Sequence, residues 1–277
     1  MASSPVLDLS ASEQARAPLA AAVRDVVGGA REVQLWGTMG WLDIRQRYSR
    51  SVMGPFWVTL TLAAFVAGLG VTYGALFRIP LAEYLPYLTV GMVVWTLIST
   101  LLIDGCNVFI AATVAIKQMP APLTVHVYRL IWRGLIIFGH NAIIIAAVLL
   151  LQPANALMGL LPSLLGLLVV CLNGIGFALT LGTLAARFRD IPPLMTNVVQ
   201  MMFFITPVLW TADTLGDRKW IALANPFFHL IEIVRAPLIG APFPALSWSF
   251  ALGLTAVNLL VALLLYARFR WRVPYWL

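Results

Sequence analysis

Long uncharged apolar runs, separated by short polar and basic segments, dominate this sequence. The first run covers residues 56–77 and the last covers residues 246–267. At a rise of about 1.5 Å per residue, about 20 such residues are enough to cross a hydrocarbon core of roughly 30 Å. Four further runs complete a set of six predicted transmembrane helices: residues 84–103, 134–151, 157–186 and 194–210.

Polar and small residues in these runs predict how the helices end and pack. Gly70 and Gly74 form a GxxxG pair on a face of small residues, which should pack closely against another helix. Asp104 follows the second run, so we expect it at a helix end or interface. Asn173 and Asn258 lie inside the fourth and sixth runs, where hydrogen bonds between helices are the preferred interpretation.

One irregular region, residues 211–245, separates the fifth run from the sixth. It mixes charges and prolines with two apolar pieces, residues 221–224 and 227–234, that are too short to span a bilayer. Such pieces suit interfacial or re-entrant helices, whose broken backbone must be covered by protein or line a water-filled cavity. The residues that we assign to this re-entrant region are Asn225, Pro226, Phe227, Glu232 and Arg235.

The composition excludes a water-soluble globule. Hydrophobic residues make up 61% of the chain and charged residues only 10%, whereas soluble domains carry roughly 25% charged residues. We therefore predict an all-α integral membrane protein in which residues 56–277 form one transmembrane domain. Cys106 and Cys171 lack metal-ligand spacing and are expected to be buried, and no metal site is predicted.

The net charge of +7 follows from basic residues at the ends of the apolar runs, which indicates membrane orientation rather than nucleic-acid binding. With six spans and both termini in the cytoplasm, eleven basic residues flank the inner side and four the outer side. The inner residues are Arg45, Arg47, Arg50, Lys117, Arg129, Arg133, Arg187, Arg189, Arg268, Arg270 and Arg272, and the outer ones are Arg78, Arg218, Lys219 and Arg235. Residues 1–32 have no apolar signal core, so we expect a loosely ordered cytoplasmic segment, with a short helix as the alternative.

Residues 33–55 combine aromatic and basic side chains just before the first span. We expect an interfacial helix in two pieces, because Gly37 and Gly40 can shift its register. Its arginines would face lipid phosphates, a partner protein or an anionic substrate, although ordinary anchoring explains them equally well. The residues that we assign to this coupling or gate helix are Trp41, Arg45, Arg47, Tyr48, Arg50, Gly54 and Pro55.

A second basic cluster, residues 115–133, joins the second and third spans. Its prolines predict a short cytoplasmic helix that could dock into a partner, although a solvated connector would have the same pattern. The residues that we assign to this docking loop are Lys117, Gln118, Met119, Pro120 and His126.

The chain carries no recognisable ATP-hydrolysing motif. A P-loop needs a lysine followed by Ser or Thr, but Lys117 precedes Gln118 and Lys219 precedes Trp220. An ATP-driven pump would thus need a separate ATPase. A secondary carrier or channel stays open as an alternative, although ionisable groups near the bilayer midplane are not evident. A membrane transferase would need catalytic carboxylates that the sequence does not show.

The motifs together resemble a known family. They are Arg47-Tyr48-Ser49-Arg50-Ser51, Gly54-Pro55-Phe56-Trp57, the loop from Lys117 to Pro122, Arg187 to Asp190, Asn225-Pro226-Phe227, Arg235 and Tyr275-Trp276-Leu277. Across residues 33–277 the chain is similar to the permease subunits of ABC-2 type exporters, particularly those for O-antigen, capsular polysaccharide and teichoic acid.

The resemblance implies a homodimer of six-span subunits, joined to two copies of a separate ABC ATPase that binds ATP and Mg. This chain would hold no cofactor and would export a lipid-linked polysaccharide across the bacterial inner membrane, in contact with membrane lipids. Residues 41–50 would form the gate, residues 116–126 would dock the ATPase, and residues 221–239 would be re-entrant. An exporter of drugs or lipids with the same architecture is the alternative.

Aromatic residues near the outer half of the spans could form a slippery lining for a sugar chain. For any one of them, helix packing or an interfacial belt is the preferred interpretation, and only the group carries the hypothesis. The candidates are Tyr73, Phe77, Tyr84, Tyr87, Trp95, Phe203, Phe204 and Trp210.

Overall fold

The computed structural model describes residues 18–49, 54, 56–150 and 153–277, and these residues form helices and connecting turns without a strand. Five helices are long and apolar enough to cross a membrane. They are α4 (Phe56–Phe77), α5 (Leu81–Cys106), α7 (Thr124–Leu149), α8 (Pro153–Arg187) and α12 (Ala245–Phe269). The runs at 56–77 and 246–267 thus correspond to α4 and α12.

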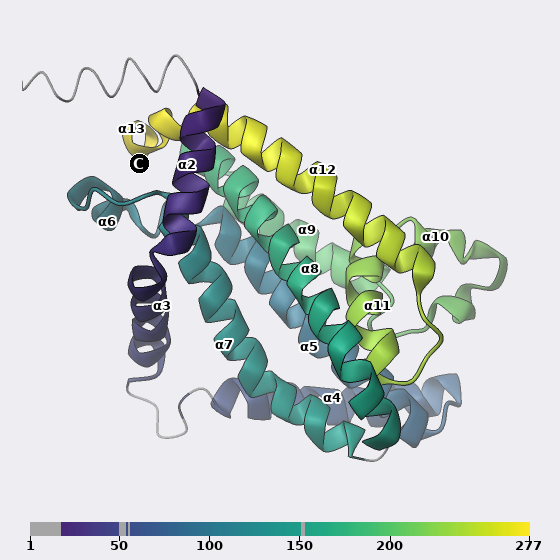
Figure 1. Cartoon of the computed structure of the whole chain (residues 1–277). Helices are drawn as coiled ribbons and strands as arrows, with labels where there is room; N and C mark the ends of the chain where they lie inside the picture. The colour runs from purple at the N-terminus through teal and green to yellow at the C-terminus, as the bar shows by residue number, and fades with distance from the viewer. Residues whose placement is uncertain (1–17, 50–53, 55, 151–152) are drawn as a thin grey trace, which may run out of the picture.

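The shorter helices gather at the two ends of the bundle (Figure 1). One end, called the terminal end here, carries α2 (Pro18–Arg31), α3 (Val33–Tyr48), α6 (Thr113–Gln118), η2 (Arg270–Arg272) and α13 (Val273–Trp276). The opposite end, called the far end, carries η1 (Ala212–Arg218) and α10 (Trp220–Leu223). Two further helices, α9 (Ile191–Ile205) and α11 (Pro226–Leu238), pack among the long ones.

The helix α5 lies at the centre of the bundle, because it packs against α7, α8, α9 and α4 and is the most buried of the long helices. The helix α11 packs mainly against α8. A Cβ on Gly159 would lie 1.9 Å from the Pro237 carbonyl oxygen, and one on Gly166 would lie 2.7 Å from the Ile233 oxygen. Only glycine therefore permits this close backbone approach, which gives α11 its place in the bundle.

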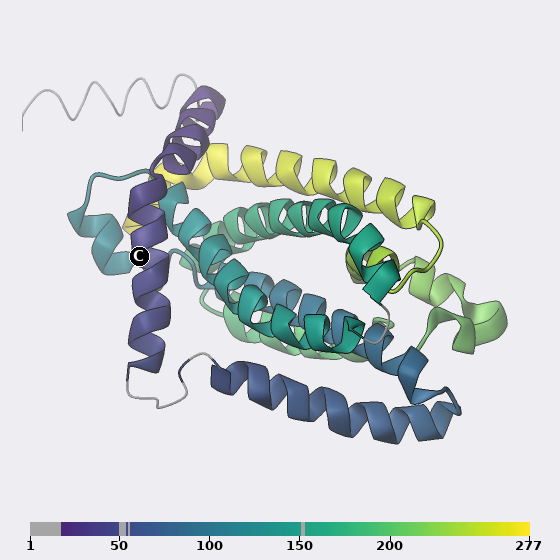
Figure 2. The ribbon, with the colours of Figure 1, turned by 60° about the horizontal axis from the view of Figure 1, so that its bottom comes forward.

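The helix α4 lies apart from the other long helices (Figure 2) and leaves most of its surface exposed. Its small face meets the start of α5, as expected. A Cβ on Gly70 would lie 2.9 Å from a methyl carbon of Leu85, and Gly74 is buried beside Tyr84 and Leu81. The exposed remainder of α4 is apolar, so lipid or another chain must cover it in a membrane.

Hydrogen bonds between helices confirm the expectation for the polar residues inside the spans. The side-chain amide of Asn173 donates to Thr255 Oγ1 at 2.7 Å, and that of Asn258 donates to the Asn173 carbonyl oxygen at 2.9 Å, which joins α8 to α12. Both cysteines are buried, also as expected, and neither forms a disulfide.

The structure decides two expectations for the N-terminal region. For residues 1–32 the preferred expectation was a loosely ordered segment with a short helix as the alternative, and the alternative holds for residues 18–31, which form the helix α2 against α12 and α7. The helix α3 is one continuous helix instead of two pieces. Gly40 does not break it but permits contact with α7, because a Cβ there would lie 2.9 Å from the Trp132 ring.

Three predicted helix boundaries also differ. The second span was predicted to end at residue 103, but α5 continues through Asp104 and Gly105, and the segment after the helix begins at Asn107. The third span was predicted from residue 134, but α7 begins at Thr124, after the prolines. The fifth span was predicted to reach residue 210, but α9 ends at Ile205, because Thr206 precedes Pro207 and is extended, as residues before proline prefer.

Candidate functional site

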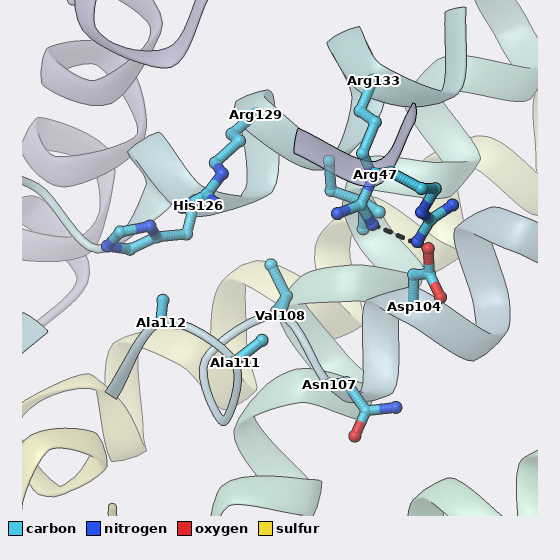
Figure 3. A pocket seen from close by; sticks show the side chains of 10 residues that line it. Arg47, Asp104, Asn107, Val108, Ala111, Ala112, His126, Arg129 and Arg133 are labelled. Atoms are coloured by element: carbon cyan, nitrogen blue, oxygen red, sulfur yellow. Dashed lines mark hydrogen bonds and ion pairs between the residues drawn. The ribbon is translucent and has the colours of Figure 1, made fainter. Parts of the chain in front are cut away.

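A basic cavity of about 220 Å³ lies at the terminal end, between α3, the end of α5 and the start of α7. Arg47 and Arg133 extend toward the end of the cavity where Asp104 lies, while His126 and Ala112 lie at the other end (Figure 3). The turn after α5 closes one side. The lining residues are Arg47, Asp104, Asn107, Val108, Ala111, Ala112, His126, Arg129, Leu130 and Arg133.

Ion pairs join the three helices around this cavity. Arg129 forms a bidentate pair with Asp43, and Arg133 reaches the same carboxylate at 3.5 Å. Arg133 also pairs with Asp104 at 2.7 Å. Because Asp43 lies on α3, Asp104 on α5 and both arginines on α7, these pairs hold α3 against the bundle.

Basic groups around the cavity outnumber the carboxylates that pair with them. Three arginines face two aspartates, so one positive charge is left over, and Arg47 forms no ion pair within the described part of the chain. Arg133 Nε and His126 Nδ1 are buried without a hydrogen-bond partner there. Arg Nε can only donate, and buried donors without partners are rare, so an oxygen ligand or water is expected beside it.

Aromatic packing supports α3 where it crosses α7. The Trp36 ring lies 6.4 Å from that of Tyr128 and 6.1 Å from that of Trp132, between ring centroids. Gly40 lets the two helices approach. The position of Arg47 over the cavity therefore depends on this contact as well as on the ion pairs.

A second polar centre lies toward the far end, around Arg235 on α11. The guanidinium is fully buried and pairs with Glu232 at 2.5 Å. It also donates to the Pro207 carbonyl oxygen at 2.9 Å and lies 3.7 Å from the centre of the Tyr87 ring. Arg235 thus supplies a hydrogen-bond donor to the Pro207 carbonyl oxygen, which lies just after the end of α9.

The start of α11 is fixed by Asn225 and Pro226. The Asn225 side chain accepts a hydrogen bond from Phe227 N at 2.9 Å, as N-cap residues do, and donates to Thr206 Oγ1 at 2.9 Å. Pro226 occupies the first helical position, where its missing N–H has no cost. The predicted short helices in this region are confirmed as α10 and α11.

Residues 34–239 match the family of ABC-2 type transporters, which covers most of the chain and both polar centres. The chain belongs to this family. It is also similar to two O-antigen export system permease proteins, both named RfbA, from Klebsiella pneumoniae. They are 24% and 22% identical over 198 residues, which cover 68% of this chain and 74% of each relative. ABC-2 permeases are membrane transport subunits, and their ATPase is normally a separate subunit.

In this permease, the predicted gate residues that the structure describes do not all contribute to the basic cavity. Arg47 lines the cavity and is exposed, while Trp41, which is 56% exposed, and the exposed Arg45 do not line it. Tyr48 ends the helix half-buried. Gly54 has a positive φ of 58°, which glycine tolerates best. Arg50 and Pro55 lie outside the described residues.

The predicted docking residues do not form one surface. Lys117, Gln118, Met119 and Pro120 are exposed at the end of α6 and in the segment after it. His126 lies in the first turn of α7 and is only 4% exposed, so its assignment to a docking surface is wrong. The sequence prediction placed His126 there because it started the third span only at residue 134, whereas α7 begins at Thr124.

The predicted channel aromatics fall into three groups. Tyr84 is buried and its hydroxyl donates to the Leu209 carbonyl oxygen at 2.5 Å, so a lining role does not fit it. The Tyr87 hydroxyl lies 3.0 Å from the Pro207 carbonyl oxygen and 2.9 Å from that of Trp210, and its single hydrogen can be donated to either. Trp95, Phe203 and Phe204 instead line an open cavity of about 460 Å³ between α5 and α9. Tyr73 and Phe77 contact each other on α4 and are half-buried, as is Trp210.

The sequence did not predict a role for His229, a polar residue toward the far end. His229 on α11 is fully buried, and its ring nitrogens contact Ser247 Oγ at 2.9 Å and the Leu223 carbonyl oxygen at 2.7 Å. No group of three or more potential metal ligands occurs among the described residues.

Proposed function

We propose that this chain is the permease of an ATP-driven exporter that carries a polysaccharide or lipid-linked glycan from the cytoplasm across the bacterial inner membrane. The observation that carries the proposal is the match over 198 residues to two O-antigen export permeases. A separate ATPase subunit binds ATP and Mg and does the hydrolysis. The chain itself supplies the path.

The proposed topology has six passes, with α9 as the fifth. The helices α2 and α13 lie at the same end of the bundle (Figure 1), which an even number of passes requires. The terminal end carries most of the basic residues, so it faces the cytoplasm. The helix α11 then packs inside the bundle as a re-entrant helix reached from outside, which agrees with its buried Arg235.

The active unit that we propose is a homodimer with two ATPase subunits. Most of α4 is exposed and apolar, and the aromatic cavity between α5 and α9 is open. A second copy that covers these faces would close a conduit lined by Trp95, Phe203 and Phe204. Aromatic faces suit a sugar chain because they contact it broadly without fixing it by hydrogen bonds.

In this proposal, the basic cavity receives the phosphate or diphosphate of the lipid-linked cargo. Arg133 Nε, which has no hydrogen-bond partner among the described residues, and Arg47, which has no ion-pair partner there, offer donors to phosphate oxygens. An entering anion competes with Asp43 and Asp104 for the same arginines. Cargo binding would thus loosen α3 from α7, which makes α3 a gate that responds to cargo.

The test uses the complex of chain and ATPase subunit in nanodiscs and measures ATP hydrolysis. A lipid-diphosphate-linked oligosaccharide should stimulate it, and hydrophobic drugs should not. With Arg47→Glu, the concentration of cargo that gives half-maximal stimulation should rise about tenfold, because the cavity loses a cationic donor to the phosphate oxygens. A tenfold rise corresponds to about 1.4 kcal/mol of binding free energy.

The control is Arg268→Glu, which reverses an exposed charge at the same end that does not line the cavity, and it should shift that concentration less than about twofold. Equal shifts in the two variants would leave general membrane anchoring as the role of Arg47. Stimulation by drugs alone would favour the drug-exporter alternative.

A further inference from the structure

An apolar groove of about 470 Å³ runs along the second half of α7 and the first half of α8. Its α7 wall lies within residues 138–150 and its α8 wall within residues 157–167, while Val234 and Leu238 of α11 complete the lining. The volume falls in the range of roughly 300–1,000 Å³ that is typical of small-molecule sites. None of the lining residues belongs to the basic cavity or to the aromatic cavity between α5 and α9.

The groove has a buried floor and an exposed rim. Ile145, Leu149 and Val234 are buried, whereas Leu157 on α8 is 77% exposed. Among the described residues that line the groove, Ser163 alone is polar, and its hydroxyl already donates to the Val234 carbonyl oxygen at 2.8 Å. The side chains of the groove therefore present hydrocarbon to whatever occupies it.

The position of the groove indicates the chemistry of its occupant. The α7 and α8 walls lie in uncharged runs of helices that are long and apolar enough to cross a membrane, so lipid rather than water meets the open rim. A wall that offers no free hydrogen-bonding side chain suits a hydrocarbon chain and gives a sugar or a headgroup nothing to bind.

A second copy of the chain is not expected to cover the groove. In Figure 1, α7 and α8 lie toward the viewer and α9 lies behind them. The aromatic cavity between α5 and α9, where we place the second copy, thus belongs to the other side of the bundle. This step rests on the proposed dimer, and it leaves the groove open to the bilayer.

We propose that the groove binds one acyl chain of a bilayer phospholipid. The chain lies between Ile145 and Leu149 of α7 and the α11 side chains of Val234 and Leu238, so it braces α11 against α7. Bound phospholipid therefore stabilises the bundle. The lipid tail of the cargo is the weaker candidate, because the cavity proposed for its phosphate lies at the terminal end and the groove lies toward the far end.

The first test measures, by native mass spectrometry, the affinity of the full-length chain for palmitoyl-oleoyl phosphatidylethanolamine. Ala146 lines the groove, so Ala146→Trp places an indole where the acyl chain would lie and should weaken binding at least about tenfold. The matched control is Ala147→Trp, since Ala147 is the next residue and is exposed but does not line the groove. It should change the affinity less than about twofold.

Thermal unfolding in detergent shows whether these variants fold. The same phospholipid should raise Tm of the wild type and of Ala147→Trp by at least about 2 °C, because a ligand of the folded state stabilises it. Ala146→Trp should unfold cooperatively and gain nothing from the lipid. Ala142→Phe fills the groove from one turn earlier and should behave in the same way, so it replaces Ala146→Trp if that variant does not fold. Equal gains in the filled and control variants would overturn the proposal.

Two further measurements distinguish the other occupants. Polyprenyl phosphate should not displace the phospholipid, and displacement would assign the groove to the tail of the cargo. Ala146→Cys should form no disulfide between protomers in the membrane, and such a disulfide would place a second copy on the groove. Either result would overturn the proposal, whereas loss of glycan export with lipid binding intact would count against the proposed function alone.

Discussion

Replacement of Arg235 by methionine should lower the free energy of unfolding by about 3–5 kcal/mol, because loss of one partner leaves a buried charge uncompensated. Arg235 is fully buried, and its removal strands the Glu232 carboxylate. The Pro207 carbonyl oxygen also loses its donor, and the Tyr87 ring loses the guanidinium above it. Denaturant titration in mixed micelles measures the change.

Two further variants show whether the stranded charge causes this loss. Arg235→Met combined with Glu232→Leu should recover part of the stability, because no carboxylate is then left unpaired. Arg218→Met removes an exposed arginine of the same far end and should change stability by less than about 0.5 kcal/mol. If Arg235→Met is as mild as Arg218→Met, Arg235 does not hold the end of α9 and α11 together.

Asp25→Ala should destabilise the terminal end by about 3 kcal/mol, since it breaks a buried charged network and leaves several donors without an acceptor. The carboxylate side chain is only 4% exposed. It serves Leu123 N and Thr124 N at the start of α7, as well as Tyr266 and Arg270. Asp25→Asn keeps one acceptor oxygen and should lose less.

An exposed ion pair provides the control for the Asp25→Ala substitution. Asp213 pairs with Lys219 at 2.6 Å, but its side chain is 81% exposed, so Asp213→Ala should change stability by less than about 1 kcal/mol. Unfolding of each variant is followed in the same micelles. Equal losses for Asp25→Ala and Asp213→Ala would mean that α2 is not fastened to α7 and α12 by this carboxylate.

The sequence predicts those features that depend on near neighbours along the chain. The uncharged runs at 56–77 and 246–267 locate α4 and α12, because hydrocarbon tolerates few charges. Asp104 was expected at a helix end and lies in the last turn of α5, where Arg133 pairs with it. Asn173 and Asn258 were expected to join helices and do so.

Features that depend on distant parts of the chain could not be predicted. Asp25 meets Thr124 and Tyr266, which follow it by 99 and 241 residues. Arg129 and Arg133 were placed before the third span as inner flanking charges, because nothing local shows that they lie in α7 and pair with Asp43 on α3. Arg235 was counted as an outer flanking charge, yet it is buried by residues of α5 and the segment after α9.

The most direct measurement reconstitutes the chain in liposomes, alone and with its ATPase subunit, and follows movement of a lipid-linked glycan to the opposite leaflet. We predict movement only when the active ATPase subunit and ATP are both present, and no movement with a subunit that cannot hydrolyse ATP. Accumulation of a solute against its gradient by the chain alone, or a covalent change in the glycan, would contradict the account.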